Sequence, residues 1–275
     1  MPLVLSVMAD ASSGGPLSLD LTGIVPDRFT GLSLEAIRRL PIRADERPIS
    51  LGAIFHVEGD TRDDVIECHG DFSRVHGVAA GMASGTMRVT GNVGRHAGEG
   101  MTGGRLEVAG NAGDWLACEM TGGQITVHGS AGDNVGGALP GSDHGLRGGV
   151  VIVHGDVGQV VGQRMRRGIV AVGGNCGEAA AFEMRAGTVV VAGRVGVHPG
   201  LGMGRGSLVS LTVHPTIPAT FQRGQAWTPP FLGVLLASLG RAGFSPAFSR
   251  PARWRQWHGD LLAGGRGEIL CPETA

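Results

Sequence analysis

The sequence predicts a fold dominated by β-structure: a right-handed parallel β-helix of about seven coils, with small mixed α/β caps at both ends. Three observations lead to this prediction. A glycine-marked unit recurs mostly at a period of nineteen, glycine columns stay in register through its copies, and each copy contains a short alternating apolar segment. The predicted organisation is an N-terminal cap over residues 1–60, a repeat array over 61–213 and a C-terminal cap with one helix over 214–275.

Each copy of the repeat starts at a methionine, or in one copy a leucine, and has glycines three, nine and twelve positions later in nearly every copy. The starting positions are Met82, Met101, Met120, Leu146, Met165, Met184 and Met203. Glycine suits a position where the chain must turn without the steric penalty of a Cβ atom. We therefore interpret the middle column as structural; it consists of Gly91, Gly110, Gly129, Gly155, Gly174 and Gly193. Asn92, Asn111 and Asn175 follow three of these glycines and suit the same corner, because asparagine tolerates left-handed conformations.

Between the first two glycine columns apolar and polar residues alternate, as in Leu106 and Val108 against Arg105 and Glu107. This alternation is typical of a strand with one buried face. Such a short strand cannot bury that face alone, so successive copies must stack into a solenoid. Left-handed β-helices repeat a hexapeptide, and nineteen is not a multiple of six, which favours the right-handed form.

One coil breaks the period, because Leu146 follows Met120 by twenty-six positions instead of nineteen. The extra positions fall roughly at 136–142. Insertions in solenoids form loops on one face, which is often a contact face. We expect a partner-contact loop here, with Gly136, Leu139, Pro140 and Ser142 as its contact residues.

The flanks contain no repeats and are predicted to cover the open strand edges at both ends of the array. Leu17, Leu19 and Leu21 suggest a strand, and residues 33–40 a short helix with Ser33 as its N-cap. A second helix is expected from Pro230 to Gly240. Its predicted apolar face consists of Phe231, Val234, Leu235 and Leu239. Residues 250–258 combine three arginines with Trp254 and Trp257, and form either a docked tail or a partner surface.

Composition narrows the class of protein. All 23 basic residues are arginine, so no Schiff-base or P-loop lysine exists, and the net charge of −1 gives no field for nucleic acid. No apolar stretch is long enough to span a bilayer. The four cysteines contain no CxxC pair, and we interpret them as reduced thiols of a soluble cytoplasmic protein. Cys176 stands in an apolar column of the repeat and is predicted to be a small core residue.

Motifs for catalysis are missing from the sequence. It contains no HExxH, GxSxG or P-loop motif, so we predict no metal site and no catalytic residue. His128 and His154 occupy the same repeat position and should stack as a solvated ladder. The outward strand positions, Val190 among them, show no carboxylate cluster of the kind that polysaccharide lyases and hydrolases use. A stand-alone carbohydrate-binding or carbohydrate-active protein is therefore a disfavoured alternative.

The array over residues 70–206, with its M-x-G-G-x-[IL]-x-V-x-G-[NDS]-[AV]-G units, resembles the C subunit of formylmethanofuran dehydrogenase. The glycine-rich C-terminal domain of the glutamate synthase large subunit has a similar array. The tail of this chain resembles the ending of the dehydrogenase subunit and is not a glutamate synthase feature. The matching residues are Pro230-Phe231-Leu232, Phe244, Trp257-His258-Gly259-Asp260-Leu261 and Gly265-Arg266-Gly267-Glu268-Ile269-Leu270.

The resemblance implies a subunit of an enzyme complex that is not catalytic by itself. The all-arginine composition favours the bacterial formyltransferase/hydrolase complex of methanol utilization and formaldehyde oxidation. That complex takes formyl-tetrahydromethanopterin through a formyl-methanofuran analogue to formate. The alternative is the C subunit of a molybdenum or tungsten formylmethanofuran dehydrogenase. Either setting implies a scaffold in a hetero-oligomer, with zinc, tetrahydromethanopterin and the methanofuran analogue handled by partner subunits and no cofactor bound by this chain.

Methanofuran analogues can carry an acidic polyglutamyl tail, and arginines can bind carboxylates through charge-assisted hydrogen bonds. Arg164, Arg166 and Arg167 cluster around Met165, and Arg185 lies one coil further on. These four arginines are therefore candidate contacts for such a tail or for a partner. The simpler interpretation is a solvated arginine face or a salt bridge between subunits.

Overall fold

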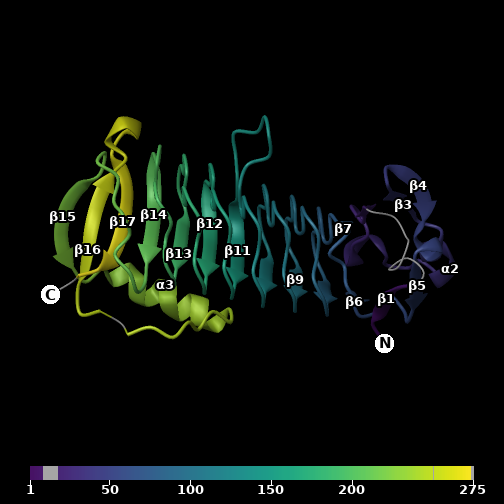
Figure 1. Ribbon diagram of the computed structural model, residues 1–275. Helices are drawn as coiled ribbons and strands as arrows, with labels where there is room; N and C mark the ends of the chain where they lie inside the picture. The colour runs from purple at the N-terminus through teal and green to yellow at the C-terminus, as the bar shows by residue number, and fades with distance from the viewer. Residues whose placement is uncertain (9–17, 250, 274–275) are drawn as a thin grey trace.

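The computed structural model describes residues 1–8, 18–249 and 251–273. As predicted, β-structure dominates it. Among the described residues thirteen strands form one large mixed sheet, sheet A, and four strands form the smaller sheet B. Sheet A runs along the whole of an elongated molecule, with the N-terminal segment at one end and the C-terminal segment at the other (Figure 1).

Each repeat contributes one strand to sheet A, and neighbouring strands are parallel and in register. Leu106, for example, pairs with Met87 on one side and Ile125 on the other, so residues of one repeat column lie side by side. The strands of the array are β8 (Thr86–Val89), β9 (Arg105–Val108), β10 (Gln124–Val127), β11 (Arg147–Val153), β12 (Arg167–Val172), β13 (Thr188–Val191) and β14 (Arg205–Ser210).

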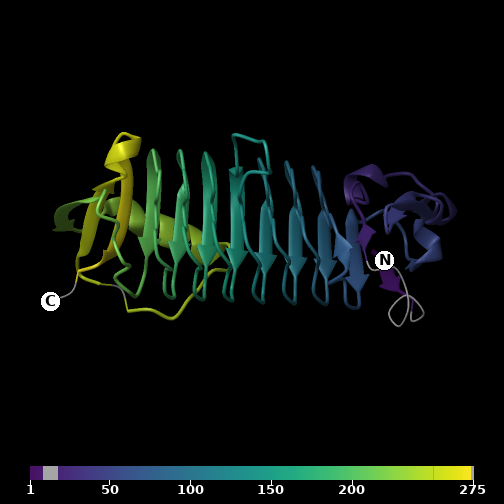
Figure 2. The ribbon, with the colours of Figure 1, turned by 45° about the horizontal axis from the view of Figure 1, so that its top comes forward.

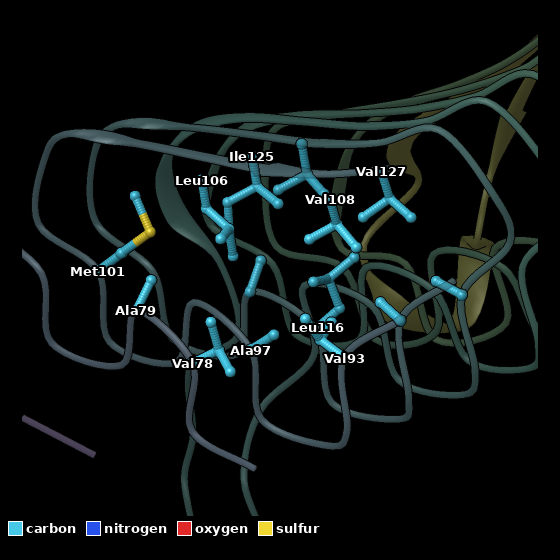
Figure 3. Packing of buried hydrophobic residues seen from close by; sticks show 14 of the residues in the cluster. Val78, Ala79, Val93, Ala97, Met101, Leu106, Val108, Leu116, Ile125 and Val127 are labelled. Atoms are coloured by element: carbon cyan, nitrogen blue, oxygen red, sulfur yellow. The ribbon is translucent and has the colours of Figure 1, made fainter. Parts of the chain in front are cut away.

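A second column of parallel bridges faces sheet A across the core. It begins at Phe72, which pairs with Val93, and it ends with the pairing of Cys176 and Val195. Phe72 stands before Met82, the start of the first repeat identified from the sequence, so the stack begins one turn of the chain earlier than those starting positions indicate. Figure 3 shows apolar side chains of β9 and β10 pointing toward residues of this facing side, such as Val93 and Leu116, and both sets are buried.

Side chains at the corners of the array bind the backbone of the next repeat. The backbone N–H of Asn111 donates to Asn92 Oδ1 at 2.8 Å, and that of Ser130 donates to Asn111 Oδ1 at 2.8 Å. The N–H of Arg194 donates to Asn175 Oδ1 at 2.9 Å in the same way. We expected these asparagines to adopt left-handed conformations, and this expectation was wrong, because none of them has a positive φ. They serve as hydrogen-bond acceptors one repeat apart.

The middle glycine column lies against the corner of the preceding repeat. A Cβ atom added at any of its six glycines would come within 2.2–2.5 Å of a backbone or side-chain oxygen. At Gly129, for example, the nearest atom is Asn111 Oδ1 at 2.3 Å. These glycines have no positive φ in the structure, so close approach, rather than turn geometry, requires them.

The N-terminal segment continues sheet A and adds sheet B. Strand β6 pairs in parallel with β8 and with β1, and β5 closes this end in antiparallel pairing. Helix α2 (Leu34–Arg38) begins after Ser33, whose Oγ accepts a hydrogen bond from the Ala36 backbone at 3.2 Å, which confirms the predicted cap. Leu17 of the expected strand lies outside the described residues. The remaining elements are β1 (Leu3–Val7), β2 (Leu19–Asp20), η1 (Pro26–Arg28), β3 (Pro41–Ala44), β4 (Arg47–Ser50), η2 (Leu51–Ala53), β5 (Phe55–Glu58), β6 (Val65–His69) and β7 (Val75–His76).

The C-terminal segment adds three strands beyond the array. Strand β17 pairs in parallel with β14 and in antiparallel with β16, and β15 pairs with β16 at the end of the sheet. Within the described part of residues 250–258, Trp254 is buried in β16, so this part of the tail is docked. The elements are β15 (Gln222–Trp227), α3 (Pro230–Arg241), β16 (Trp254–Gly259), η3 (Leu261–Ala263) and β17 (Arg266–Pro272).

Helix α3 folds back across the outer face of sheet A (Figure 1). Leu232 and Leu239 pack there with Val190 and Val209. Val190 was predicted to be outward, but it is buried because the helix covers it. The predicted helix face was also partly wrong, since Phe231 and Val234 are 39% and 71% exposed. The side of the helix that packs is the one carrying Leu232, Leu235, Leu236 and Leu239.

All four cysteines are free and buried, as expected for core residues. Burial raises the pKa of the Cys68 and Cys176 thiols to about 12 and that of Cys271 to about 11. The pKa of Cys118 is raised for the same reason. Thiolates are the nucleophilic and metal-binding form of cysteine, so these four side chains act as apolar core residues near neutral pH.

The glycine column generates a prediction about stability. We expect Gly129→Ala to lower the free energy of unfolding by about 1–3 kcal/mol, because its methyl group overlaps Asn111 Oδ1. Gly240→Ala in α3 is the matched control. A Cβ there meets nothing within 4 Å, and alanine stabilises helices by up to about 1 kcal/mol relative to glycine. Chemical denaturation of the two variants would measure this, and equal stabilities would contradict the packing argument.

Candidate functional site

A hollow with a volume of about 640 Å³ lies over the starts of β12, β14 and β17 and the segment just before β13. Its most evident feature is charge, because four guanidinium groups line it. Backbone of the strand-starting glycines forms part of its wall, and strand β16 borders it. The side chains that line it are Arg166, Arg167, Arg205, Ser207, Gln256, His258, Arg266 and Glu268.

The repeat itself places the arginines together. Arg167 and Arg205 each stand two positions after the first methionine of their repeats, immediately before a strand glycine. Arg266 joins them because the register of β17 with β14 pairs it directly with Arg205. Adjacent strands are about 4.8 Å apart, so these side chains emerge close to one another. Ala186 holds the same position before β13 and leaves room between them.

The one carboxylate of the hollow is already engaged. Ser207 Oγ donates to one oxygen of Glu268 at 2.5 Å, and Gln256 Nε2 donates to the other at 2.5 Å. In the part of the chain that the structure describes, no carboxylate oxygen lies within 4.0 Å of Arg166, Arg167, Arg205 or Arg266. Arginine forks bind carboxylates and phosphates in pairs of charge-assisted hydrogen bonds. The hollow is therefore suited to an anion.

The structure brings together two of the four predicted arginines. Arg166 and Arg167 line the hollow, whereas Arg164 turns away: its Nε binds Glu183 Oε2 at 2.7 Å and its Nη1 donates to the Ser142 carbonyl at 2.9 Å. The bond to Glu183 raises the pKa of Arg164. Arg185 is exposed and does not line the hollow. Sequence reasoning missed Arg205, although its position after Met203 repeats that of Arg167 after Met165.

The insertion projects from the edge of the array at the strand starts (Figures 1 and 2). Gly136 anchors it in the stack, since its N–H donates to Leu116 and its carbonyl accepts from Leu146. The N–H of Leu139 donates to Glu119 Oε1 at 3.3 Å, and the Ser142 carbonyl binds Arg164. Pro140 is exposed, in a turn of the loop. The loop is thus tied to the repeats on both sides and presents Pro140 to solvent.

A ladder of charged and imidazole side chains crosses the outer face of sheet A. The His128 and His154 rings stack as predicted, with centroids 5.2 Å apart and an interplanar angle of 6°. His128 lies 3.5 Å from Glu107, and Arg88 lies 3.7 Å from both Glu107 and Glu67. Partial burial, and then the neighbouring His128, lower the pKa of His154. Among the residues described, no group of three or more histidine, cysteine, aspartate or glutamate side chains is arranged to hold a metal ion.

Within the described ranges, no helix has the length and apolar character needed to cross a membrane.

Comparison with known sequences finds relatives over part of the chain. No family model matches it. It is 38% identical over 83 residues to the C subunit of the molybdenum-containing formylmethanofuran dehydrogenase 1 of Methanothermobacter marburgensis, covering 30% of this chain and 21% of that protein. It is 38% identical over 80 residues to the C subunit of the formyltransferase/hydrolase complex Fhc of Methylorubrum extorquens, covering 29% of this chain and 30% of that protein. The matched segment thus spans less than a third of the length of either curated relative.

Comparison with solved structures extends the likeness to nearly the whole chain. A chain from the crystal structure of the formyltransferase/hydrolase complex (FhcABCD) of Methylorubrum extorquens, in complex with methylofuran, superposes with a TM-score of 0.88. The two are 34% identical in sequence, and the alignment covers 98% of this chain and 100% of the other. The likeness therefore extends beyond the repeats to the segments on both sides of them.

The histidine ladder generates a prediction about pH. The pKa of His154 in the folded protein is lowered below 6.5, so below about pH 6.5 the unfolded chain binds the extra proton more readily. The stabilisation from neutral His154 is complete above that pH and is lost as the pH falls through the lowered pKa. We expect the melting temperature to decrease from pH 7.5 to pH 5, and to decrease less in His154→Gln.

A variant of the neighbouring His128 should change the pH dependence of the melting temperature less than the His154 variant does. His128→Gln removes only the repulsion, which is the smaller cause, so its effect on the pH profile should be the weaker of the two. Thermal melting across the pH range measures both variants. A profile that His154→Gln leaves unchanged would show that this residue does not carry the dependence.

Proposed function

The chain belongs to the C-subunit family shared by formylmethanofuran dehydrogenases and formyltransferase/hydrolase complexes, and we propose that it is a non-catalytic scaffold subunit of a formyltransferase/hydrolase complex. The likeness to a subunit of such a complex over the length of both chains is the observation that carries this proposal. The partners would be the other subunits of that complex in a hetero-oligomer.

The proposed complex would convert formyl-tetrahydromethanopterin, through the formyl derivative of a methanofuran analogue, to formate. This step belongs to one-carbon oxidation in the cytoplasm, as in methanol utilization and formaldehyde oxidation. Partner subunits would supply the zinc and hold the pterin. What supports this setting over a molybdenum or tungsten dehydrogenase is the full-length likeness to a chain of the FhcABCD complex, since the dehydrogenase relatives match over a shorter share of their length.

A scaffold role agrees with how the array is built, and we assign it to residues 61–213, with caps over 1–60 and 214–275. Every strand from β8 to β14 is hydrogen-bonded on both edges, so the array has no free strand in its middle. We class it as a right-handed parallel β-helix of about seven coils. One strand per repeat and the parallel bridges from Phe72 to Val195 support that class.

The assembly itself is the test of this function. We expect the chain, co-expressed with the other FhcABCD-type subunits of the same organism, to elute with them in one complex of fixed stoichiometry. The isolated chain should neither transfer nor hydrolyse the formyl group of a formylated methanofuran analogue. Native mass spectrometry and a formate assay measure the two outcomes. Activity of the chain alone, or its absence from the assembled complex, would contradict the proposal.

We further propose that the arginine hollow contacts the polyglutamyl tail of the methanofuran analogue. Arg166 and Arg167 of the predicted set carry this proposal together with Arg205 and Arg266, because none of the four is paired with a carboxylate among the described residues. Arg164 would act at the margin through Glu183, and Arg185 would lie beyond the hollow. A salt bridge to a partner subunit is the competing role for the same arginines.

Charge reversal tests the hollow. We expect Arg167→Glu combined with Arg205→Glu to weaken binding of the polyglutamylated cofactor by the assembled complex about tenfold or more, since each lost charged hydrogen bond is worth about 1.5–3 kcal/mol. Arg39→Glu, an exposed arginine at the opposite end of the molecule, is the matched control. Isothermal titration measures the affinity. Unchanged affinity with intact assembly would remove the hollow from cofactor binding.

A further inference from the structure

The charges of this nearly neutral chain are divided between its two ends. Residues 1–71 include twelve acidic side chains and six arginines, whereas residues 147–275 include thirteen arginines and six acidic side chains. The two regions lie at opposite ends of the elongated molecule (Figure 2). The C-terminal half therefore carries a positive field that attracts acidic partners.

Two projections rise from the strand-start edge, one just before this basic half in the sequence and one within it (Figures 1 and 2). One is the inserted loop over residues 136–145, and the other is the turn that contains η3, just before β17 (Figures 1 and 2). Sheet order places β12, β13 and β14 between β11 and β17, so the projections are four strand spacings, or about 19 Å, apart. The corner segments 164–167, 182–186 and 201–205 lie between them. We call these three segments, together with η3, the corner surface.

The η3 turn holds a leucine out in solvent. Leu262 is 86% exposed and Leu261 is 54% exposed, and Leu201 on the neighbouring corner is 40% exposed. The turn is rigidly held by Asp260, which is 1% exposed. One oxygen of Asp260 accepts from the Leu262 N–H at 2.9 Å and the other accepts from the Gly202 N–H at 3.1 Å. Because the backbone of the turn is already held by these bonds, it loses little conformational freedom when Leu262 inserts into a partner.

The same surface lacks the anions that would neutralise it. Its corner segments contain five arginines and a single acidic residue, Glu183, which is already bound to Arg164. Arg166, Arg185 and Arg205 are exposed, and no carboxylate within the described ranges lies within 4.0 Å of them. The exposed leucines of η3 lie beside these unpaired arginines. Such a surface suits a partner that offers both an apolar recess and carboxylates. A polyanionic chain alone would leave Leu261 and Leu262 in water.

We infer that the corner surface docks a partner protein, which receives Leu262 in an apolar recess and presents carboxylates to Arg185, the arginine of this surface that is exposed and does not line the hollow. This inference rests on the proposed function, because the partner is one of the other subunits of the complex. The inserted loop stands at the far side of the surface and limits how the partner can be placed. The arginines steer the encounter and fix the orientation, and Leu262 supplies apolar burial.

Assembly of the complex from purified parts tests the inference. We expect Leu262→Ser to raise the dissociation constant of the chain from the co-expressed partner subunits by about tenfold or more, because the burial of a leucine side chain is lost. Arg185→Glu should also weaken assembly and make it less sensitive to salt. Val234→Ser is the matched control, since Val234 is 71% exposed on α3 and lies outside the corner surface. A photo-crosslinking residue in place of Leu262 should join the chain to a partner subunit.

If Leu262→Ser and Arg185→Glu assemble as tightly as the unchanged chain, the docking surface is elsewhere. A crosslink to a second copy of this chain would overturn the inference in favour of self-association. Loss of poly-γ-glutamate binding in Arg185→Glu with unchanged assembly would overturn it, because Arg185 would then bind the cofactor tail instead of a partner. Failure of the unchanged chain to assemble would overturn the proposed function and this inference with it, whereas failure of the variants' effect alone leaves the proposed function intact.

Discussion

The hydrogen bonding of each repeat to the next is the interaction on which the other features of this molecule depend. Strand pairs such as β9 and β10 bond in parallel register, and the corner side chains repeat that bonding, as Asn92 does for the Asn111 backbone. The two sets of bonds fix the chain length from each strand to its corner, which is the same from Ile125 to Ala131 as from Val151 to Val157. The fixed spacing between the strand and the corner glycine follows from this requirement, and so does the glycine column, because Gly129 must lie against the preceding corner without a Cβ. Sequence periodicity and backbone stacking are therefore consequences of one constraint.

That constraint explains which parts of the structure could be predicted. The strands and the stacking order could be predicted because alternation and glycine spacing are local signals, and the Ser33 cap because its partner, Ala36, is close by in the chain. The packing of α3 on sheet A could not be predicted in the same way. Nothing in the sequence around the helix indicates that Leu232, and not Phe231, packs with Val190. The arginine hollow was only half predicted for the same reason. Arg205 and Arg266 are far apart in the sequence, and only the pairing of β14 with β17 brings them together.

The array also tolerates an interruption without losing its register. The strands β10 and β11 that flank the insertion still pair residue by residue, from Gln124 with Val150 to Val127 with Val153. The extra residues leave the stack after Gly136 and return at Leu146, which donates to the Gly136 carbonyl. Added length at a corner thus costs only the conformational entropy of closing the loop, and this cost increases slowly with the number of residues. Projections can be placed along this edge while the core behind them stays unchanged, which makes the edge a suitable place for specific contacts.

At the C-terminal end of the array, strand pairing also builds the surface that carries the arginine hollow. An open parallel sheet would present an unpaired strand that could pair with another chain, and β14 avoids this by pairing with β17. Because β17 enters in register, its start brings Arg266 beside Arg205 and places the preceding η3 turn at the strand-start edge. Asp260 then ties that turn to the Gly202 backbone. The residues that protect the last repeat from unwanted pairing are therefore continuous with those that form the arginine hollow and with the exposed Leu262. A change that loosens β17 should disturb the pairing at the end of the sheet, the arginine hollow and the η3 turn together.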